Sequence, residues 1–345
     1  MRGDDRSPVG SLTRAGLTCL QPFYRMPVAA RNAMFNTGIR KSVHLKRPVI
    51  SVGNVSTGGT GKTPMVMELI RRIQSMGYRA GVLLRGYKAG VSGSDEAKLY
   101  TDEFGEKISV AANPDRVAGA RSMLEQGNVD VFLLDDGFQH RQVHRDLDIV
   151  LIDATDPVHC ARLLPRGFLR EPASNMKRAD AVIVTHANQV DESSLKQLDD
   201  AIASLGGEPP VAHAAHAWVG YYDEKDQYHD LNTLCENKVR GVCGIGNPRP
   251  FCGLLSKHIG RDMPVQIMSD HHDYSVEFLK DLFVRIGDDG VDAVVTTEKD
   301  WVKWRVLLNG VQTDHVPIYR PALQMEFLDG NERFNDIVAT LLRRG

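Results

Sequence analysis

A buried strand, a glycine-rich turn and an amphipathic helix follow one another in residues 48–76, PVISVGNVSTGGTGKTPMVMELIRRIQSM. This order constrains the fold more than any other feature, because it is how a chain builds a cradle for nucleotide phosphates. Gly58, Gly59 and Gly61 allow the backbone to turn tightly, so that successive N–H groups point at phosphate oxygens. The segment predicts that the chain binds a nucleoside triphosphate.

The turn also supplies polar side chains of the kind that phosphate chemistry needs. Lys62 would place a mobile positive charge on the β- and γ-phosphates, and the Thr63 hydroxyl would bind a magnesium ion. Ser56 stands where the common motif has glycine, so a chance Gly-Lys-Thr between a strand and a helix is the alternative interpretation. The predicted ATP-binding residues are Gly58, Gly59, Thr60, Gly61, Lys62 and Thr63.

Strands that alternate with helices along the chain predict an α/β fold of the P-loop NTPase type, with a doubly wound, mostly parallel sheet. Most of the strands are continuous Val, Ile and Leu runs, which is typical of parallel strands covered on both faces. The expected strands are 48–53, 79–84, 107–111, 129–134, 147–152 and 180–185. The expected helices are 64–76, 114–126 and 195–205.

A Gly/Pro cluster at residues 206–210 marks the predicted domain boundary, because the alternation of strands and helices starts again after it. We therefore expect a P-loop domain over residues 1–209 and a second, smaller α/β domain over 210–315. The expected strands of the second domain are 238–244, 264–268 and 291–296, and its expected helices are 249–259, 276–286 and 298–308.

An acidic pair ends another apolar strand in the segment VDVFLLDDGFQH, residues 129–140. Asp135 and Asp136 would lie where a parallel sheet presents its carboxyl ends to a ligand, and they are candidate ligands for the magnesium ion. The alternative is that they cap a turn. His140 and Gln139 follow on the same loop and could donate to phosphate or sugar oxygens, although a histidine at such a place is more often structural.

Two further polar segments are weaker signals. A Gly/Ser-rich loop after the second strand ends in Asp95 and Glu96, and loops of this kind often complete a site. Charged loop residues are usually solvated, so the sequence alone gives Asp95 no firm role. The run from Asp270 to Tyr274 could be a metal cluster, an acid/base group or a polar turn.

Composition describes an ordinary globular chain of 345 residues with a net charge of −2. Five cysteines without C-x-x-C spacing favour reduced thiols and argue against zinc. No run of apolar residues reaches the length of a membrane span, and the N-terminus lacks the apolar core of a signal peptide. These features exclude a disulfide-rich secreted domain and an integral membrane protein.

The N-terminal segment, residues 1–47, is basic: it holds nine Lys and Arg against two Asp, a net charge of +7. Apolar residues lie between the basic ones, and Pro22 and Pro27 interrupt them, so we expect two short amphipathic helices. Such a segment could lie on an anionic membrane surface. A helix packed on the domain with a solvated basic face is the alternative, and no motif supports nucleic-acid binding.

Taken in series, the segments VGNVSTGGTGKTP, LLRGY, SDE, NPDR, LLDDGFQH, LLPRGFLREP, GIGNP, SDHHDYS and TTEKD resemble the tetraacyldisaccharide 4′-kinase (lipid A 4′-kinase) family. The resemblance runs from about residue 12 to residue 325. It implies ATP-dependent phosphorylation of the 4′-hydroxyl of a tetraacylated glucosamine disaccharide 1-phosphate, a lipid A precursor. It places the chain as a peripheral protein on the cytoplasmic face of the bacterial inner membrane, attached through the N-terminal segment.

The resemblance also implies roles for individual residues. Asp95 matches the catalytic base, His271 the histidine that supports it, and Glu96 a neighbour of the metal. Three further positions match polar residues that hold the sugar or its phosphate: Arg116, His140 and Arg170. Two departures concern the loop around Asp95, because Ser94 stands where the family has glycine and Ala97 where it has proline.

The family's two α/β domains are joined by a pair of strands. The resemblance therefore implies that the chain leaves the P-loop domain near residues 210–220 and returns near 316–323. A C-terminal helix at about 331–343 would then belong to the first domain. No obligate protein partner is inferred.

Two other classes of function remain open on sequence alone. One is a regulatory P-loop ATPase whose hydrolysis drives association with a protein partner. The other is a lipid-binding scaffold, for which Lys62 would be dispensable. The acceptor dependence of ATP turnover discriminates between these interpretations and a kinase.

Overall fold

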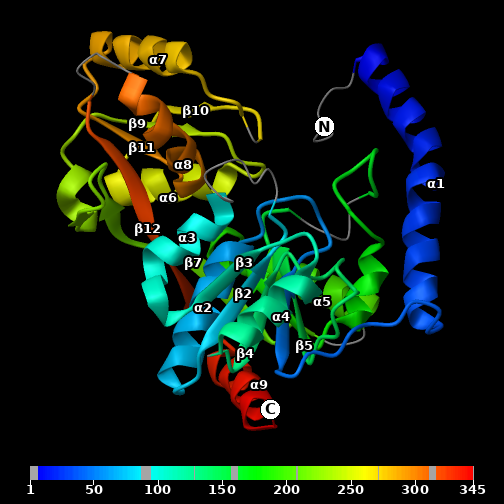
Figure 1. Ribbon diagram of the computed structural model, residues 1–345. Coiled ribbons are helices and arrows are strands. Elements are labelled where there is room, and N and C mark those ends of the chain that lie inside the picture. The colour runs from blue at the N-terminus through cyan, green and yellow to red at the C-terminus, as the bar shows by residue number, and fades with distance from the viewer. Residues whose placement is uncertain are drawn as a thin grey trace. The chain divides into compact units, whose positions relative to one another are not determined.

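The computed structural model divides into two compact units, Met1–Ala215 with Phe327–Gly345, and His216–Glu326 (Figure 1). The domain limits that we predict, 209/210 and 315/316, stay predictions; the units divide at 215/216 and 326/327. The residues that the structure describes are 7–86, 95–127, 129–156, 162–206, 209–270, 272–310 and 316–344.

A parallel sheet with the strand order β6-β5-β1-β4-β2-β3 forms the centre of the first unit. Its strands are β1 (Val49–Gly53), β2 (Ala80–Leu84), β3 (Ser109–Ala112), β4 (Val131–Asp135), β5 (Leu147–Asp153) and β6 (Ala181–Thr185). Every residue of all these strands except β3 is buried, as continuous aliphatic runs predict for strands covered on both faces. The predicted parallel, P-loop-type fold is confirmed.

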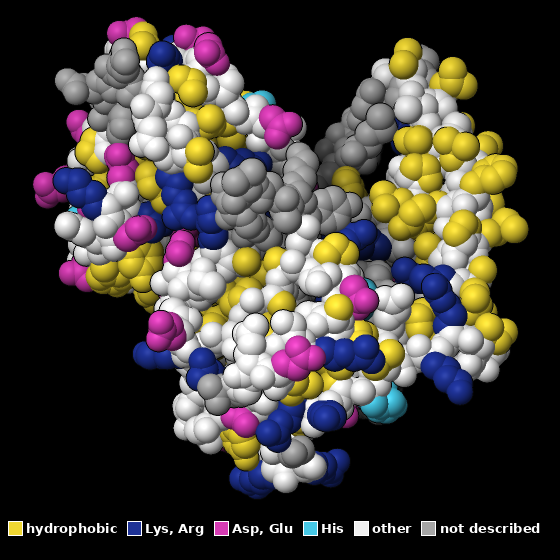
Figure 2. Space-filling model, in the orientation of Figure 1, with side chains coloured by type: hydrophobic (Ala, Val, Ile, Leu, Met, Phe, Trp, Pro, Cys, Tyr) yellow, Lys and Arg dark blue, Asp and Glu magenta, His cyan; other side chains and the backbone are white. Residues whose placement is uncertain are grey.

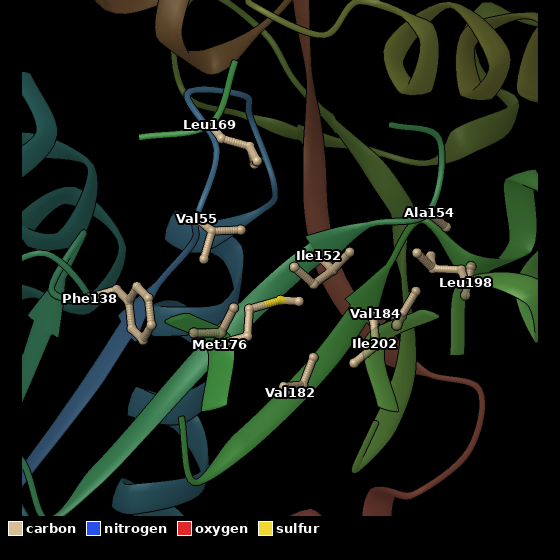
Figure 3. Packing of buried hydrophobic residues seen from close by; sticks show 12 residues of the cluster. Val55, Phe138, Ile152, Ala154, Leu169, Met176, Val182, Val184, Leu198 and Ile202 are labelled. Atoms are coloured by element: carbon tan, nitrogen blue, oxygen red, sulfur yellow. The ribbon is translucent and has the colours of Figure 1, made fainter. Parts of the chain in front are cut away.

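Helices cover this sheet and fix the loops at its carboxyl edge. The helices are α2 (Lys62–Ser75), α3 (Asp95–Phe104), α4 (Arg116–Gln126) and α5 (Glu192–Gly206). Figure 3 shows the apolar cluster in which α5 contributes Leu198 and Ile202. Val55 and Phe138, which follow β1 and β4, belong to the same cluster. The loops that carry the predicted site are therefore anchored in the hydrophobic core.

The second unit has a sheet with helices on both faces and the strand order β10-β9-β11-β12-β7. Its strands are β7 (Ala212–Tyr222), β9 (Val239–Cys243), β10 (Val265–Ile267), β11 (Ala293–Thr296) and β12 (Ile318–Phe327), and β8 (Tyr228–His229) pairs with β7. One core contains α6 (Arg249–Ile259), and the other contains α7 (Val276–Asp288) and α8 (Glu298–Leu307). Val295 of β11 faces the first core and Val294 the second, as a strand's period of two requires.

The chain leaves the first unit through β7 and returns through β12, and α9 (Asn331–Arg344) then joins the first unit. Arg72 of α2 contacts the segment that returns to the first unit. Its guanidinium lies 4.4 Å from the centroid of the Phe327 ring and 5.2 Å from that of Phe334. Cation–π contacts of this kind stabilise the arginine beside the two stacked rings.

Helix α1 (Pro8–Asn36) is a single helix, so the prediction of two short helices is wrong. Pro22 and Pro27 lie inside it and remove two backbone donors. Contacts before, between and after the prolines hold the helix on the first unit, because Gln21 bonds to Leu163, Tyr24 to Arg170 and Asn32 to Glu171. Tertiary contacts here outweigh the local preference of proline.

Much of α1 exposes apolar side chains, and Figure 2 shows hydrophobic residues gathered over it. We call these residues the apolar face of α1; they are Val9, Leu12, Leu20, Phe23, Met26 and Met34. Phe23 is 75% exposed and Leu12 77%. Within the described part of the chain, no helix has the length and apolar character that a membrane crossing requires.

Candidate active site

The turn between β1 and α2 has the conformation that its glycines predict. Gly61 lies just before α2 with φ 81°, a left-handed conformation that side chains rarely adopt. The Asn54 amide donates to the Gly58 carbonyl oxygen at 3.1 Å and to the Thr60 hydroxyl at 3.0 Å. Lys62 and Thr63 begin the helix, so their side chains start at its positive end.

A buried threonine at the end of β6 holds this turn from the other side. The Thr185 hydroxyl donates to the Thr60 carbonyl oxygen at 3.0 Å, and Thr185 is fully buried. Thr185 was not predicted as a site residue, because a threonine that ends a buried strand carries no signal of its own. Asn54 and Thr185 together preorganise the phosphate-binding turn.

Asp136 lies between two positive charges. Arg170 Nη1 lies 2.8 Å from both carboxylate oxygens, and Lys62 Nζ lies 3.5 Å from Oδ1. Burial alone would raise the pKa of Asp136, but Lys62 and Arg170 outweigh it and hold the pKa below its ordinary value. The structure thus brings together three residues that were predicted separately from the sequence.

Asp135, the last residue of β4, is buried and accepts a hydrogen bond from the Tyr100 hydroxyl at 2.7 Å. Arg116, at the start of α4, donates to the Asp135 carbonyl oxygen at 3.4 Å. Tyr100 was not predicted as a site residue, because no helix was expected over residues 95–104. These residues form helix α3, and the Tyr100 side chain is fully buried.

His140 extends the cluster from Asp135 and Arg116. Its Nδ1 lies 3.4 Å from Arg116 Nη1, and Arg145 donates to its carbonyl oxygen at 3.5 Å. Burial, followed by the charges of Arg116 and Arg145, lowers the pKa of His140 to about 4. The ring is therefore neutral at pH 7, with Nδ1 accepting from Arg116. Its buried Nε2 then carries the proton and has no partner among the described residues.

Glu171 is a fully buried carboxylate that the sequence analysis did not single out. It accepts from Gln139 Nε2 at 2.9 Å, from Asn175 Nδ2 at 2.7 Å and from Arg178 Nη1 at 2.9 Å. Gln139 Nε2 also donates to the Asn54 carbonyl oxygen at 2.8 Å, so it faces the protein interior. In the sequence, the position of Glu171 directly after Arg170 is the one feature that could have indicated its role.

Three predicted residues cannot be placed at the site. Helix α3 begins at Asp95, and the side chains of Asp95 and Glu96 lie outside what the structure describes. His271 also lies outside the described residues. The predicted pairing of Asp95 with His271 stays a prediction.

The carboxylates and the hydroxyl at the site are oxygen donors of the kind that a magnesium ion takes. Among the described residues, no three His, Cys, Asp or Glu side chains are grouped to hold a metal. Mg²⁺ does not need such a group, because it usually keeps several waters and takes one or two carboxylates with the phosphates of its substrate. Asp135, Asp136 and the Thr63 hydroxyl offer this kind of donor set at one edge of the sheet.

A family model for tetraacyldisaccharide-1-P 4′-kinase matches residues 13–343. The chain belongs to this family. The tetraacyldisaccharide 4′-kinase of Syntrophus aciditrophicus is 36% identical over 87% of this chain and 85% of its own length. The enzyme of the same name from Geobacter sulfurreducens is 33% identical over 95% of this chain and 93% of its own length. The family resemblance found in the sequence is thereby confirmed.

A solved structure supports the same assignment. The crystal structure described as "apo" form LpxK from Aquifex aeolicus in complex with ATP is 26% identical to this chain. The match covers 96% of this chain and 99% of that one, with a TM-score of 0.69. The fold of the family therefore extends over nearly all of the chain.

Proposed function

We propose that this chain is an ATP-dependent kinase that phosphorylates the 4′-hydroxyl of a tetraacylated glucosamine disaccharide 1-phosphate. Membership of the tetraacyldisaccharide 4′-kinase family supports the reaction and the substrate class. The observation that carries the proposal within the chain is the position of Lys62. It starts the helix after the glycine-rich turn, and it lies 3.5 Å from a carboxylate at the neighbouring strand end.

Phosphate binding follows from the turn and the helix after it. The backbone N–H groups of residues 58–63 and the positive end of α2 attract the phosphates of ATP. Lys62 would exchange its contact with Asp136 for the β- and γ-phosphates. Arg170, which lies 2.8 Å from Asp136, would compensate the carboxylate after this exchange. Phosphoryl transfer depends mainly on such positioning and charge neutralisation.

Thr63, Asp135 and Asp136 would hold a magnesium ion, directly or through water. When bound there, the ion would supply charge neutralisation at the phosphates. Tyr100 would keep one oxygen of Asp135 oriented by its hydrogen bond.

The acceptor side would be formed by Arg116, His140 and Arg170. The neutral His140 ring offers a buried Nε2–H, and an unsatisfied buried donor is costly unless a ligand pairs with it. Deprotonation of the 4′-hydroxyl is assigned to Asp95, supported by His271, on the motif resemblance. If the two act as a unit, Asp95→Ala and His271→Ala should each lower kcat, and the double variant should be scarcely worse than the worse single variant.

The acyl chains of such a substrate lie in a membrane, and the apolar face of α1 offers a means to reach it. We infer peripheral binding of α1 at the cytoplasmic face of the inner membrane. The support is the exposed apolar side chains of α1 together with the basic residues around them.

A transfer assay tests the proposal directly. Wild-type protein is mixed with γ-labelled ATP and a defined tetraacyl disaccharide 1-phosphate in detergent, and the product is separated from free phosphate. We expect label in the disaccharide and little ATP turnover without the acceptor. Release of labelled phosphate to water, independent of the acceptor, would instead identify an ATPase switch.

A further inference from the structure

We propose that Tyr24 and Asn32 of α1 are positioning residues for the active site, acting through Arg170 and Glu171. Helix α1 would then be part of the framework that holds Asp136 and Gln139, in addition to any role at a membrane. This inference rests on the proposed kinase function and concerns the same site.

The helix presents two different stripes along its length. Six of its less exposed residues recur with the helical period and form a narrow seam toward the first unit: Leu17, Gln21, Tyr24, Val28, Asn32 and Phe35. The apolar face of α1 lies elsewhere on the helix and is exposed. Seam and apolar face can therefore be changed independently.

The seam makes polar contacts with the segment that carries Arg170. Gln21 Nε2 donates to the Leu163 carbonyl oxygen at 3.1 Å, and the Tyr24 hydroxyl donates to the Arg170 carbonyl oxygen at 2.9 Å. From the other side, the Arg170 N–H donates to the Val55 carbonyl oxygen at 2.8 Å. The backbone of Arg170 is thus fixed between α1 and the loop after β1, while its guanidinium reaches Asp136.

Asn32 makes the second connection. It is 7% exposed, and its amide donates to Glu171 Oε2 at 3.2 Å. Arg141 holds Asn32 in place, because its guanidinium donates to the Asn32 carbonyl oxygen at 3.1 Å and lies 5.2 Å from the centroid of the Phe35 ring. Glu171 in turn orients Gln139, which bonds to the Asn54 carbonyl oxygen beside the phosphate-binding turn.

The choice of residue types favours positioning over simple packing. Apolar contacts would be sufficient to pack a helix on the first unit. This seam instead places the Tyr24 hydroxyl on Arg170 and the Asn32 amide on Glu171. A buried carboxylate such as Glu171 needs its donors, since each missing partner leaves charge uncompensated. Loss of the Asn32 amide should therefore shift Glu171 toward its remaining partners and displace Gln139.

The test compares Tyr24→Phe, Asn32→Ala and their combination with wild type in the detergent assay. We expect each single variant to lower kcat by roughly 5- to 30-fold, with the ATP affinity changed by less than about twofold. Co-sedimentation with anionic vesicles should stay at the wild-type level, because the apolar face is intact. Thr18→Ala is the matched control, since its hydroxyl bonds to the Arg14 carbonyl oxygen within the helix; it should keep the wild-type kcat.

A second measurement separates positioning from general destabilisation. In an Arg170→Ala background, Tyr24→Phe should have little further effect on kcat, because its hydroxyl acts through Arg170; the same holds for Asn32→Ala in a Glu171→Gln background. Fully multiplicative losses, or wild-type kcat in both single variants, would overturn the inference. Failure of the wild type to phosphorylate the disaccharide would instead refute the proposed function.

Discussion

Lys62 and Asp136 form a contact that ATP would have to rearrange. The 3.5 Å separation and the second cation, Arg170, keep Asp136 ionised and Lys62 oriented toward the edge of the sheet. Asp136 has φ 52°, a left-handed conformation that aspartate tolerates better than most residues. Its carboxylate is therefore aimed by the backbone as well as by its partners.

We expect Lys62→Ala and Thr63→Ala each to lower turnover by at least about 10²-fold, because phosphoryl transfer relies on charge neutralisation and positioning. The measurement is initial-rate transfer to the disaccharide at saturating ATP. Lys196→Ala, which removes an exposed lysine of α5, is the control and should behave as wild type. Near-normal turnover in either site variant would contradict the phosphate-binding assignment.

The protonation state of His140 gives a second prediction at this scale. The unfolded chain binds a proton at this histidine below pH ~6.5, whereas the folded protein binds it only near its pKa of about 4. His140 therefore makes the folded protein less stable as the pH falls from about 6.5 to 4. An NMR titration of the His140 ring should show a midpoint near 4, and Arg116→Ala should raise it. A midpoint near 6.5 in the folded protein would show that the ring is solvated.

Among the structural elements, β1 and the loop after β4 approach more closely than side chains allow. A Cβ on Gly53 would lie 2.5 Å from Phe138 Cβ and 2.7 Å from the Phe138 backbone nitrogen. We expect Gly53→Ala to lower the free energy of unfolding by about 1–3 kcal/mol through overpacking. Urea denaturation measures this change. Gly253→Ala in α6 meets nothing within 4 Å and is the matched control; it should be neutral or slightly stabilising.

The elements with strong local patterns could be predicted from the sequence. The predicted helix at 249–259 coincides with α6, and the predicted strand at 147–152 differs from β5 by one residue. The prediction of two short helices in place of α1 was wrong, because the contacts of Tyr24 and Asn32 outweigh the effect of the two prolines. Within the site, the glycine turn and the acidic strand end carry their own signals. Tyr100, Glu171 and Thr185 do not, because their roles depend on partners far away in the sequence.

At the scale of the whole molecule, we propose two roles for α1, and a deletion of the helix would not separate them. Removing residues 1–40 should move the protein from membrane to soluble fractions, but it also removes the Tyr24 and Asn32 contacts to Arg170 and Glu171. A loss of activity in that deletion therefore reports on the site as well as on the membrane. Point variants on the apolar face avoid this ambiguity.

We expect the double variant Leu12→Ser, Phe23→Ser to reduce co-sedimentation with anionic vesicles, because both side chains are more than two-thirds exposed on α1. Salt should weaken the wild-type association, since each Lys or Arg near an anionic surface contributes about 1 kcal/mol. Val284→Ser on α7 removes an exposed apolar side chain of the second unit and should leave vesicle binding unchanged. If the α1 double variant binds vesicles as tightly as wild type, the membrane contact lies elsewhere on the chain, and α1 serves the active site alone.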